Sequence, residues 1–216
     1  VGYEAGVAVT TGVRNTLIGG IAGDALTDAD DNVVLGYQAL STDTLGSRTI
    51  AIGKGALTTQ NFTSATDTYN TAMGYNAGNQ VTTGIQNTLI GGLAGDALTE
   101  GFGNVALGYS SLSSDTLGKR SVAIGHQTLL NQNFTSVTDA FNTAVGHEAG
   151  KAVTTGIQNT LIGGLAGDAI TTANSNVAVG KSALSATTTG GANTAIGTLA
   201  LDSNTTAIGN VAVGYD

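Results

Sequence analysis

Apolar and polar positions along the chain repeat with a short, fixed period. Three copies of the motif Asn-Thr-Leu-Ile-Gly, Asn15–Gly19, Asn87–Gly91 and Asn159–Gly163, are evenly spaced along the chain, and looser copies lie between them. The glycine that ends each copy recurs with a 17-residue period, except for two longer, 21-residue steps, Gly53 to Gly74 and Gly125 to Gly146. A period of this kind indicates a stacked-repeat architecture, in which each coil contacts mainly its neighbours.

The residues before each motif glycine are expected to form a short β-strand. The residue directly before the glycine is always aliphatic or Met, and the one before that is mostly Ala, with Leu17, Leu89 and Leu161 as regular exceptions. Neighbouring residues of a strand point to opposite faces, so both faces need cover. One face would fill the coil, and the other is predicted to pack on the same strand of other copies, which makes the chain a homo-oligomer. Every fourth coil, which carries the leucine, is expected to be bulkier.

The segment after each glycine is predicted to form a second strand. Three residues after the glycine lies a small residue such as Ala22 or Ala39, and the next position is either Gly, as in Gly23, or Leu, as in Leu40. A polar connection rich in Thr, Ser, Asp and Asn leads to the next motif. Two short strands and two connections in about 17 residues predict an all-β solenoid built from a flattened β-roll.

The period also predicts the domain organisation. We expect a single repeat domain over residues 1–216, with superrepeats at 1–72, 73–144 and 145–212 and the start of a further coil at 213–216. Both ends fall inside the motif, so the chain is interpreted as a segment of a longer fibre.

Two coils contain a longer connection, at residues 58–69 and 130–141. Each carries two aromatic rings in a chain that is poor in them. Binding residues often lie on loops held by a rigid scaffold. We therefore predict that these loops contact a partner through their four aromatic residues, unless the rings pack down on the wider coil: Phe62, Tyr69, Phe134 and Phe141.

Composition narrows the class of protein. The chain has 33 Gly and no Pro, which suits a tight turn in every coil, and its 41% hydrophobic residues argue against disorder. A net charge of −8 with only seven basic residues argues against binding to nucleic acid. There is no cysteine for a disulfide framework. The sequence shows no signal peptide and no apolar run of membrane-spanning length, so we expect no membrane insertion in this segment.

Motif copies such as Asn104–Gly108 and Asn193–Gly197 resemble the head repeats of trimeric autotransporter adhesins and related repeats in phage tail fibres. The resemblance covers nearly the full chain and implies a left-handed parallel β-roll whose three copies intertwine as a homotrimer. Adhesin heads usually have shorter coils, so the 17-residue spacing and the 21-residue steps favour the phage-fibre variety. The sequence contains no neck, stalk or anchor, so it does not decide whether a phage or a bacterium carries the fibre.

Equivalent positions of successive coils form columns of similar residues, and these columns are candidate binding rows. The motif asparagines, including Asn15, Asn87 and Asn159, are expected to bond to one another and to turn backbone rather than to a ligand. The residue after each motif glycine forms a second column with several tyrosines. Outward tyrosines could bind glycans, although we favour a role in covering neighbouring turns. The members of this column are Tyr3, Tyr37, Lys54, Tyr75, Tyr109, His126, His147, Lys181 and Tyr215, interrupted by Gly20, Gly92 and Gly164.

Metal sites and catalysis are not expected. Asp28, Asp30 and Asp31 alternate in a way that can hold calcium, but the equivalent stretches of the later superrepeats lack them, which favours a solvated acidic turn. His126 and His147 belong to different coils and lack a partner at ligand spacing. No Ser-His-Asp arrangement or phosphate-binding loop is recognisable, so we expect no enzyme and no cofactor.

The sequence therefore predicts an extracellular, structural and adhesive fibre shaft. It would belong to a phage tail fibre or a bacterial surface adhesin, and its partner would be a glycan or protein receptor on a cell surface. A purely structural filament or spacer is the alternative. An ice-binding solenoid is a distant third, because Val33, Val105 and Val177 interrupt the threonines of the strands.

Overall fold

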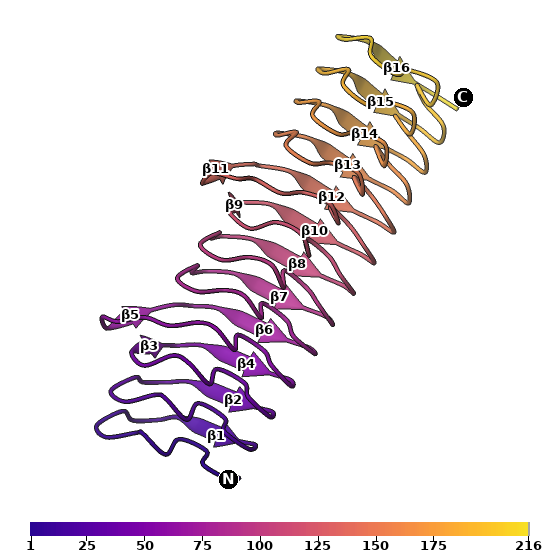
Figure 1. The fold of residues 1–216 in the computed structure, drawn as a ribbon. Helices are drawn as coiled ribbons and strands as arrows, with labels where there is room; N and C mark the ends of the chain where they lie inside the picture. The colour runs from indigo at the N-terminus through magenta and orange to yellow at the C-terminus, as the bar shows by residue number, and fades with distance from the viewer. Residues whose placement is uncertain (216) are drawn as a thin grey trace.

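The computed structural model describes residues 1–215 as one parallel β-solenoid, whose coils stack in a row from the N-terminus to the C-terminus (Figure 1). Each coil contributes one short strand to a continuous twelve-stranded sheet. No described residue lies in a helix. The strands of this sheet, in spatial order, are β1 (Thr16–Ile18), β2 (Val33–Leu35), β4 (Ile50–Ile52), β6 (Thr71–Met73), β7 (Thr88–Ile90), β8 (Val105–Leu107), β10 (Val122–Ile124), β12 (Thr143–Val145), β13 (Thr160–Ile162), β14 (Val177–Val179), β15 (Thr194–Ile196) and β16 (Val211–Val213).

The sequence period sets the register of the sheet. Thr16 pairs with Val33, one ordinary period further along the chain. Ile50 pairs with Thr71 across one of the longer steps, so the longer coils keep the same alignment. Both pairs are parallel. The four extra residues leave the sheet as a loop and do not shift it.

The strands alternate between inside and outside as predicted. The middle residue of a strand points into the coil, where Ala72, Leu89 and Ala106 are fully buried. The first and third residues point outward. The interior is thus a narrow column of small and medium aliphatic side chains.

Leucines in the strands are accommodated by glycines, so the expectation of a bulkier fourth coil is wrong. A Cβ on Gly78 would lie 2.7 Å from Cδ1 of Leu89, and one on Gly95 would lie 2.7 Å from Cδ2 of the same leucine. Where the strand carries alanine, as at Ala123, the neighbouring positions hold Leu112 and Leu129 instead. Each leucine is matched by a missing side chain, which keeps the filled volume of every coil similar.

The predicted second strand is also wrong. The segment after each motif glycine is a series of turns, because its second and fourth residues have positive φ angles, as at Ile21 (47°) and Gly23 (54°). Strands need negative φ. The segment still bonds to the next coil, since the Gly23 N–H donates to the Ala39 carbonyl at 3.0 Å.

The motif glycine ends each strand at a close approach between coils. Gly19 has φ of 132°, and a Cβ there would lie 2.5 Å from the carbonyl oxygen of Gly36 in the next coil. The corresponding glycines, Gly91 and Gly163 among them, have similar angles and the same contact. A side chain at this position would force neighbouring coils apart, which explains why the glycine recurs.

The two long coils project beyond the stack on one side (Figure 1). There, β3 (Gly46–Ser47) pairs with β5 (Thr66–Asp67), and β9 (Gly118–Lys119) pairs with β11 (Thr138–Asp139), both in parallel. These small sheets tie each loop to the coil before it.

Candidate functional site

The outer face of the twelve-stranded sheet carries an apolar column that is continuous along the whole sheet. Its third strand positions are all Ile, Leu, Val or Met, and Ile18, Leu35 and Leu107 are each more than 40% exposed. The first strand positions are Thr, Val or Ile. Contiguous apolar patches of this length mark interaction sites on protein surfaces. We call this surface the outer sheet face. Its third-position members are Ile18, Leu35, Ile52, Met73, Ile90, Leu107, Ile124, Val145, Ile162, Val179, Ile196 and Val213.

The asparagine column is internal and holds the coils together. The Asn87 side chain is buried, its Oδ1 accepts a hydrogen bond from the Asn104 N–H at 3.0 Å, and its Nδ2 donates to the Gly101 carbonyl at 2.9 Å. Asn15 and Asn159 make the same pair of bonds to the following coil. Bonds to backbone predominate over bonds between amides. Because the amides are used in this way, they present no row of free groups to a ligand.

The aromatic residues of the two long loops divide into two kinds. Phe62 and Phe134 are 7% and 5% exposed and pack into their coils. Tyr69 and Phe141 are 54% and 50% exposed. Only the latter two can therefore meet a partner directly.

A buried polar network supports each long loop. The Asp43 carboxylate accepts hydrogen bonds from the N–H groups of Gly46 (3.1 Å) and Phe62 (3.0 Å) and from Nε2 of Gln60 (2.6 Å), and Gln60 in turn accepts one from Asn70. Asp115 and Gln132 repeat this arrangement in the second loop. Burial raises the pKa of Asp115. No local sequence pattern marks these residues, whose burial follows from the wider coil.

Tyr69 and Phe141 belong to an exposed column that also carries charged residues. The column consists of the residues that directly precede each motif asparagine, or the Thr or Ser that replaces the asparagine. The side chains of the column lie above one another. The Arg48 guanidinium lies 5.8 Å from the Tyr69 ring centroid, and that of Arg120 lies 5.7 Å from the Phe141 centroid. Arg48 and Arg120 also form ion pairs with Asp67 and Asp139. Each loop, together with the arginine of the coil before it, thus presents an aromatic ring, a guanidinium and a carboxylate together.

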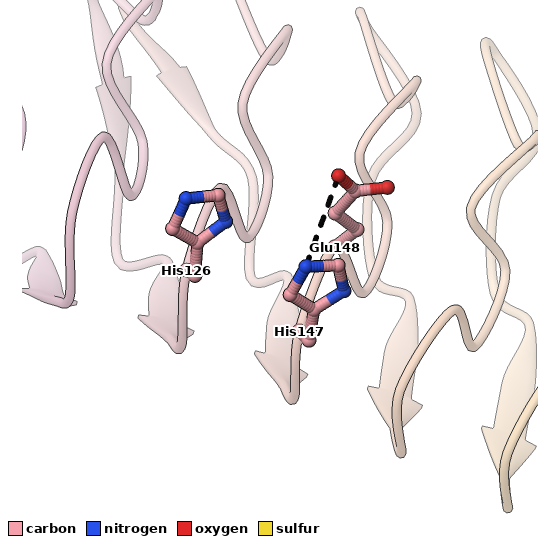
Figure 2. A group of neighbouring side chains, drawn as sticks. All are labelled: His126, His147 and Glu148. Carbon is pink, nitrogen blue, oxygen red and sulfur yellow. Dashed lines mark ion pairs between the residues drawn. The ribbon is translucent and has the colours of Figure 1, made fainter.

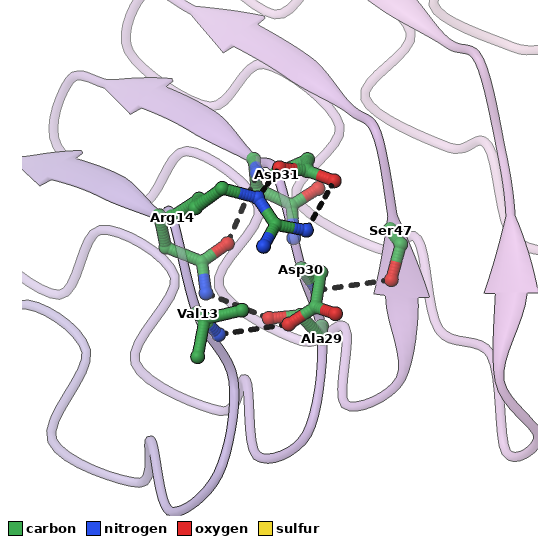
Figure 3. Close-up of polar contacts among 8 residues, drawn as sticks. Val13, Arg14, Ala29, Asp30, Asp31 and Ser47 are labelled. Atoms are coloured by element: carbon green, nitrogen blue, oxygen red, sulfur yellow. Dashed lines mark hydrogen bonds and ion pairs between the residues drawn. The ribbon is translucent and has the colours of Figure 1, made fainter.

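The acidic turn of the first superrepeat is bonded to the coil before it (Figure 3). Asp30 accepts a hydrogen bond from the Val13 N–H at 2.8 Å, and Asp31 pairs with Arg14 at 2.5 Å. Asp28 accepts one from Thr11 Oγ1. The hydrogen bond from Arg14 lowers the pKa of Asp31. Each carboxylate has a protein partner of its own, so the three do not converge on a common cation position.

Among residues 1–215, three buried carboxylate oxygens lack a hydrogen-bond partner. They are Oδ1 of Asp24, Asp96 and Asp168, which occupy the same place in successive superrepeats. Burial raises the pKa of all three carboxyls. These residues carry a cost in stability that recurs once per superrepeat.

The structure brings together two histidines that are distant in the sequence and have no ligand-like spacing there (Figure 2). His126 and His147 lie in adjacent coils with their rings stacked, 5.3 Å between centroids and 6° between planes, and Tyr109 stacks on the other side of His126. Glu148 lies beside them, with its Oε1 3.9 Å from Nε2 of His147. One ligand atom from each of the three residues lies within 4.8 Å of the others. The signal is present in the sequence, because both histidines directly follow a motif glycine.

Comparison with known proteins found no matching protein-family model, no similar curated protein and no similar solved structure. Among residues 1–215, no helix is long and apolar enough to cross a membrane.

Proposed function

We propose that this chain is a shaft segment of a trimeric extracellular fibre, either a phage tail fibre or a bacterial surface adhesin, that attaches its carrier to a cell surface. The observation that carries the proposal is the outer sheet face. Twelve strands present aliphatic side chains to one side, and no other part of the described chain covers them. Burying these side chains stabilises an assembly by roughly 25 cal/mol per Å² of apolar surface.

Other copies of the same chain are the partner that fits this face. Its apolar columns repeat with every coil, at about 4.8 Å per strand, over a length of roughly 50 Å. A partner must carry the same axial repeat to stay in register over that distance, and a second copy does so by construction. Parallel copies around one axis would bury the same column in every chain, as closed symmetry requires. The number three is taken from the resemblance of the repeats to trimeric fibres.

The exposed loop residues support a role in attachment. Tyr69 and Phe141 at the ends of the two loops lie next to the guanidinium groups of Arg48 and Arg120, which belong to the coil before each loop. Aromatic rings with adjacent charged groups are typical contact residues for partners. In a trimer each loop would occur three times, which multiplies weak contacts into avidity.

The oligomer is tested by light scattering coupled to size-exclusion chromatography. The wild-type chain should elute with three times its 21.3 kDa mass. The variant Ile90→Lys/Leu107→Lys places charges on the outer sheet face and should dissociate to monomer or aggregate. Val13→Lys is the matched control, since Val13 is similarly exposed but lies off the sheet. A wild-type chain that stays monomeric at micromolar concentration would refute the assembly.

Attachment is tested separately with the trimer intact. Binding to a glycan array and to whole bacterial cells should fall in Tyr69→Ser/Phe141→Ser, with the oligomeric mass unchanged. Tyr37→Ser/Tyr109→Ser, in the exposed tyrosine column off the loops, tests the alternative that this column binds glycans. Undiminished binding by Tyr69→Ser/Phe141→Ser would refute the assignment of the loops as the contact surface. No binding at all by a trimeric wild type would favour the spacer function over adhesion.

A further inference from the structure

We propose that His126, His147 and Glu148 form a binding site for a divalent transition-metal ion, with Zn²⁺ as the ion that best fits the ligand set. The inference is independent of the fibre function, since it rests on one chain and two adjacent coils.

The backbone holds the two histidines in register. His126 follows β10 and Gly125, His147 follows β12 and Gly146, and the Glu148 N–H donates to the His126 carbonyl at 2.9 Å. The imidazoles therefore start from neighbouring rungs of one sheet. Two nitrogens bound to one Zn²⁺ at 2.0–2.1 Å lie about 3.3 Å apart. Ligand atoms already within 4.8 Å reach that separation by side-chain rotation, which the exposure of both rings permits.

The ligand set is of the kind that zinc uses. Two imidazole nitrogens and one carboxylate oxygen supply three of the four tetrahedral positions, and the fourth is left to water or another ligand. Imidazole also suits Cu²⁺ and Ni²⁺, whereas Ca²⁺ and Mg²⁺ prefer oxygen ligands. The site should therefore discriminate between these two groups of ions.

The surroundings favour a cation. Glu148 brings a carboxylate to the two imidazoles, with its Oε1 3.9 Å from Nε2 of His147. Lys151 is the competing cation, 3.0 Å from Glu148 Oε1, and it is exposed enough to move away.

The structure also leaves the His147 ring room to move. On the far side of His147 the post-glycine column is interrupted by Gly164, and nothing lies within 4 Å of the place where its Cβ would be. The ring can therefore turn without meeting a side chain at this position of the next coil. A bound ion would tie β10 to β12 at the point where the 21-residue coil with its long loop separates them.

The test uses the full chain and Zn²⁺ alone, in calorimetric titration and in NMR spectra of the imidazole groups. The chain has only two histidines, so every imidazole signal comes from the site. We expect one ion per chain, displacement of both sets of imidazole signals, and no response to Mg²⁺ or Ca²⁺. His126→Gln or His147→Gln should each weaken binding at least ~10-fold, and Glu148→Gln by a smaller factor. Circular dichroism checks that the variants fold.

Two further variants sharpen the test. Glu4→Gln is the matched control, because Glu4 holds the coil position of Glu148 but follows Tyr3 instead of a histidine, and it should bind as the wild type does. One superrepeat before the three ligands, the equivalent positions hold Lys54, Tyr75 and Asn76. The triple substitution Lys54→His/Tyr75→His/Asn76→Glu should therefore create a second site and double the stoichiometry.

Three results would overturn the proposal. They are no uptake by the wild type at about 1 mM Zn²⁺, unchanged affinity in His126→Gln/His147→Gln, and displacement of the signals of one histidine only. The last would indicate adventitious binding to a single exposed imidazole.

Discussion

The side chain of Leu89, in the strand, fills the space beside Gly95. In several coils whose strand carries alanine, a leucine at the position of Gly95 fills this space instead. A Cβ at Gly95 would lie 2.7 Å from Cδ2 of Leu89. In the next coil the arrangement is reversed, with Ala106 in the strand and Leu112 at the position equivalent to Gly95. The large and the small residue thus trade places between the strand and the turn segment of a coil, and the core volume is conserved.

This relationship predicts that the two residues can be exchanged together but not singly. Leu89→Ala leaves a cavity and should cost about 2–5 kcal/mol. Gly95→Leu overfills the coil and should cost about 1–3 kcal/mol. The double variant reproduces the pattern around Ala106, and Leu112 shows that leucine is tolerated there at φ of 53°. We expect its unfolding midpoint to lie close to that of the wild type.

Denaturation of the four proteins of this double-mutant cycle by urea measures the coupling. A favourable interaction energy of at least ~1 kcal/mol is expected. Simple additivity of the two single losses would contradict the packing argument.

The asparagine column should be among the most sensitive parts of the fold. Asn87→Ala removes an acceptor from the Asn104 N–H and a donor from the Gly101 carbonyl, both inside the stack. Two buried backbone groups without partners should cost about 2–4 kcal/mol. Gln86→Ala, one residue earlier on the exposed column, is the control and should change stability little, since Ala192 holds the same coil position at φ of 55°. Thermal melting followed by circular dichroism at a fixed chain concentration compares them, and similar losses in both would show that the ladder is not the source of stability.

The repeat pattern is sufficient to predict the architecture of the sheet. The spacing of the motif glycines indicates the parallel register, including the alignment of Ile50 with Thr71 across a 21-residue coil. The alternation of Ala with an aliphatic residue indicates the inner and outer faces. Both features are local and periodic, which is why sequence alone carries them.

Other features depend on backbone angles and on contacts between coils. The turn segment around Ala39 resembles a strand in sequence, because a small residue followed by leucine fits a strand pattern. The positive φ angles of Gln38 and Leu40 cannot be recognised from the sequence. The histidine pair is marked in the sequence only by its place after two successive motif glycines. The separation of the two histidines along the chain matches no familiar ligand spacing, yet in this solenoid it places His126 directly beside His147.

The two rings of one long loop should differ in what they do. Phe134 is buried, and Phe134→Ala should cost about 3 kcal/mol. Phe141 is half-exposed, so Phe141→Ala should cost less than ~1 kcal/mol. Hydrogen exchange of the backbone amides at 130–141 locates the effect, with faster exchange expected only in the Phe134 variant. Equal loosening by both would mean that Phe141 also anchors the loop.

The unpartnered carboxylates predict an unusual dependence of stability on pH. Burial raises the pKa of Asp24, Asp96 and Asp168 in the folded chain. The folded state therefore holds more protons than the unfolded state at pH values between the ordinary and the raised pKa. Stability from these groups is complete at low pH and falls as pH rises through that window, the reverse of a carboxylate in an ion pair.

Removing the charge should recover this loss at neutral pH. Asp96→Asn is expected to raise the melting temperature at pH 7 by roughly 2 °C or less, because solvent still screens part of the carboxylate, and the triple variant at all three positions by more. Relative to the wild type, the gain should grow as pH rises from about 4 to 7. Asp202→Asn is the control at the equivalent position of a later coil, where Ser203 donates a hydrogen bond to the carboxylate, and it should not stabilise. A gain in the triple variant that is the same at both ends of the pH range would show that burial of the charge is not its cause.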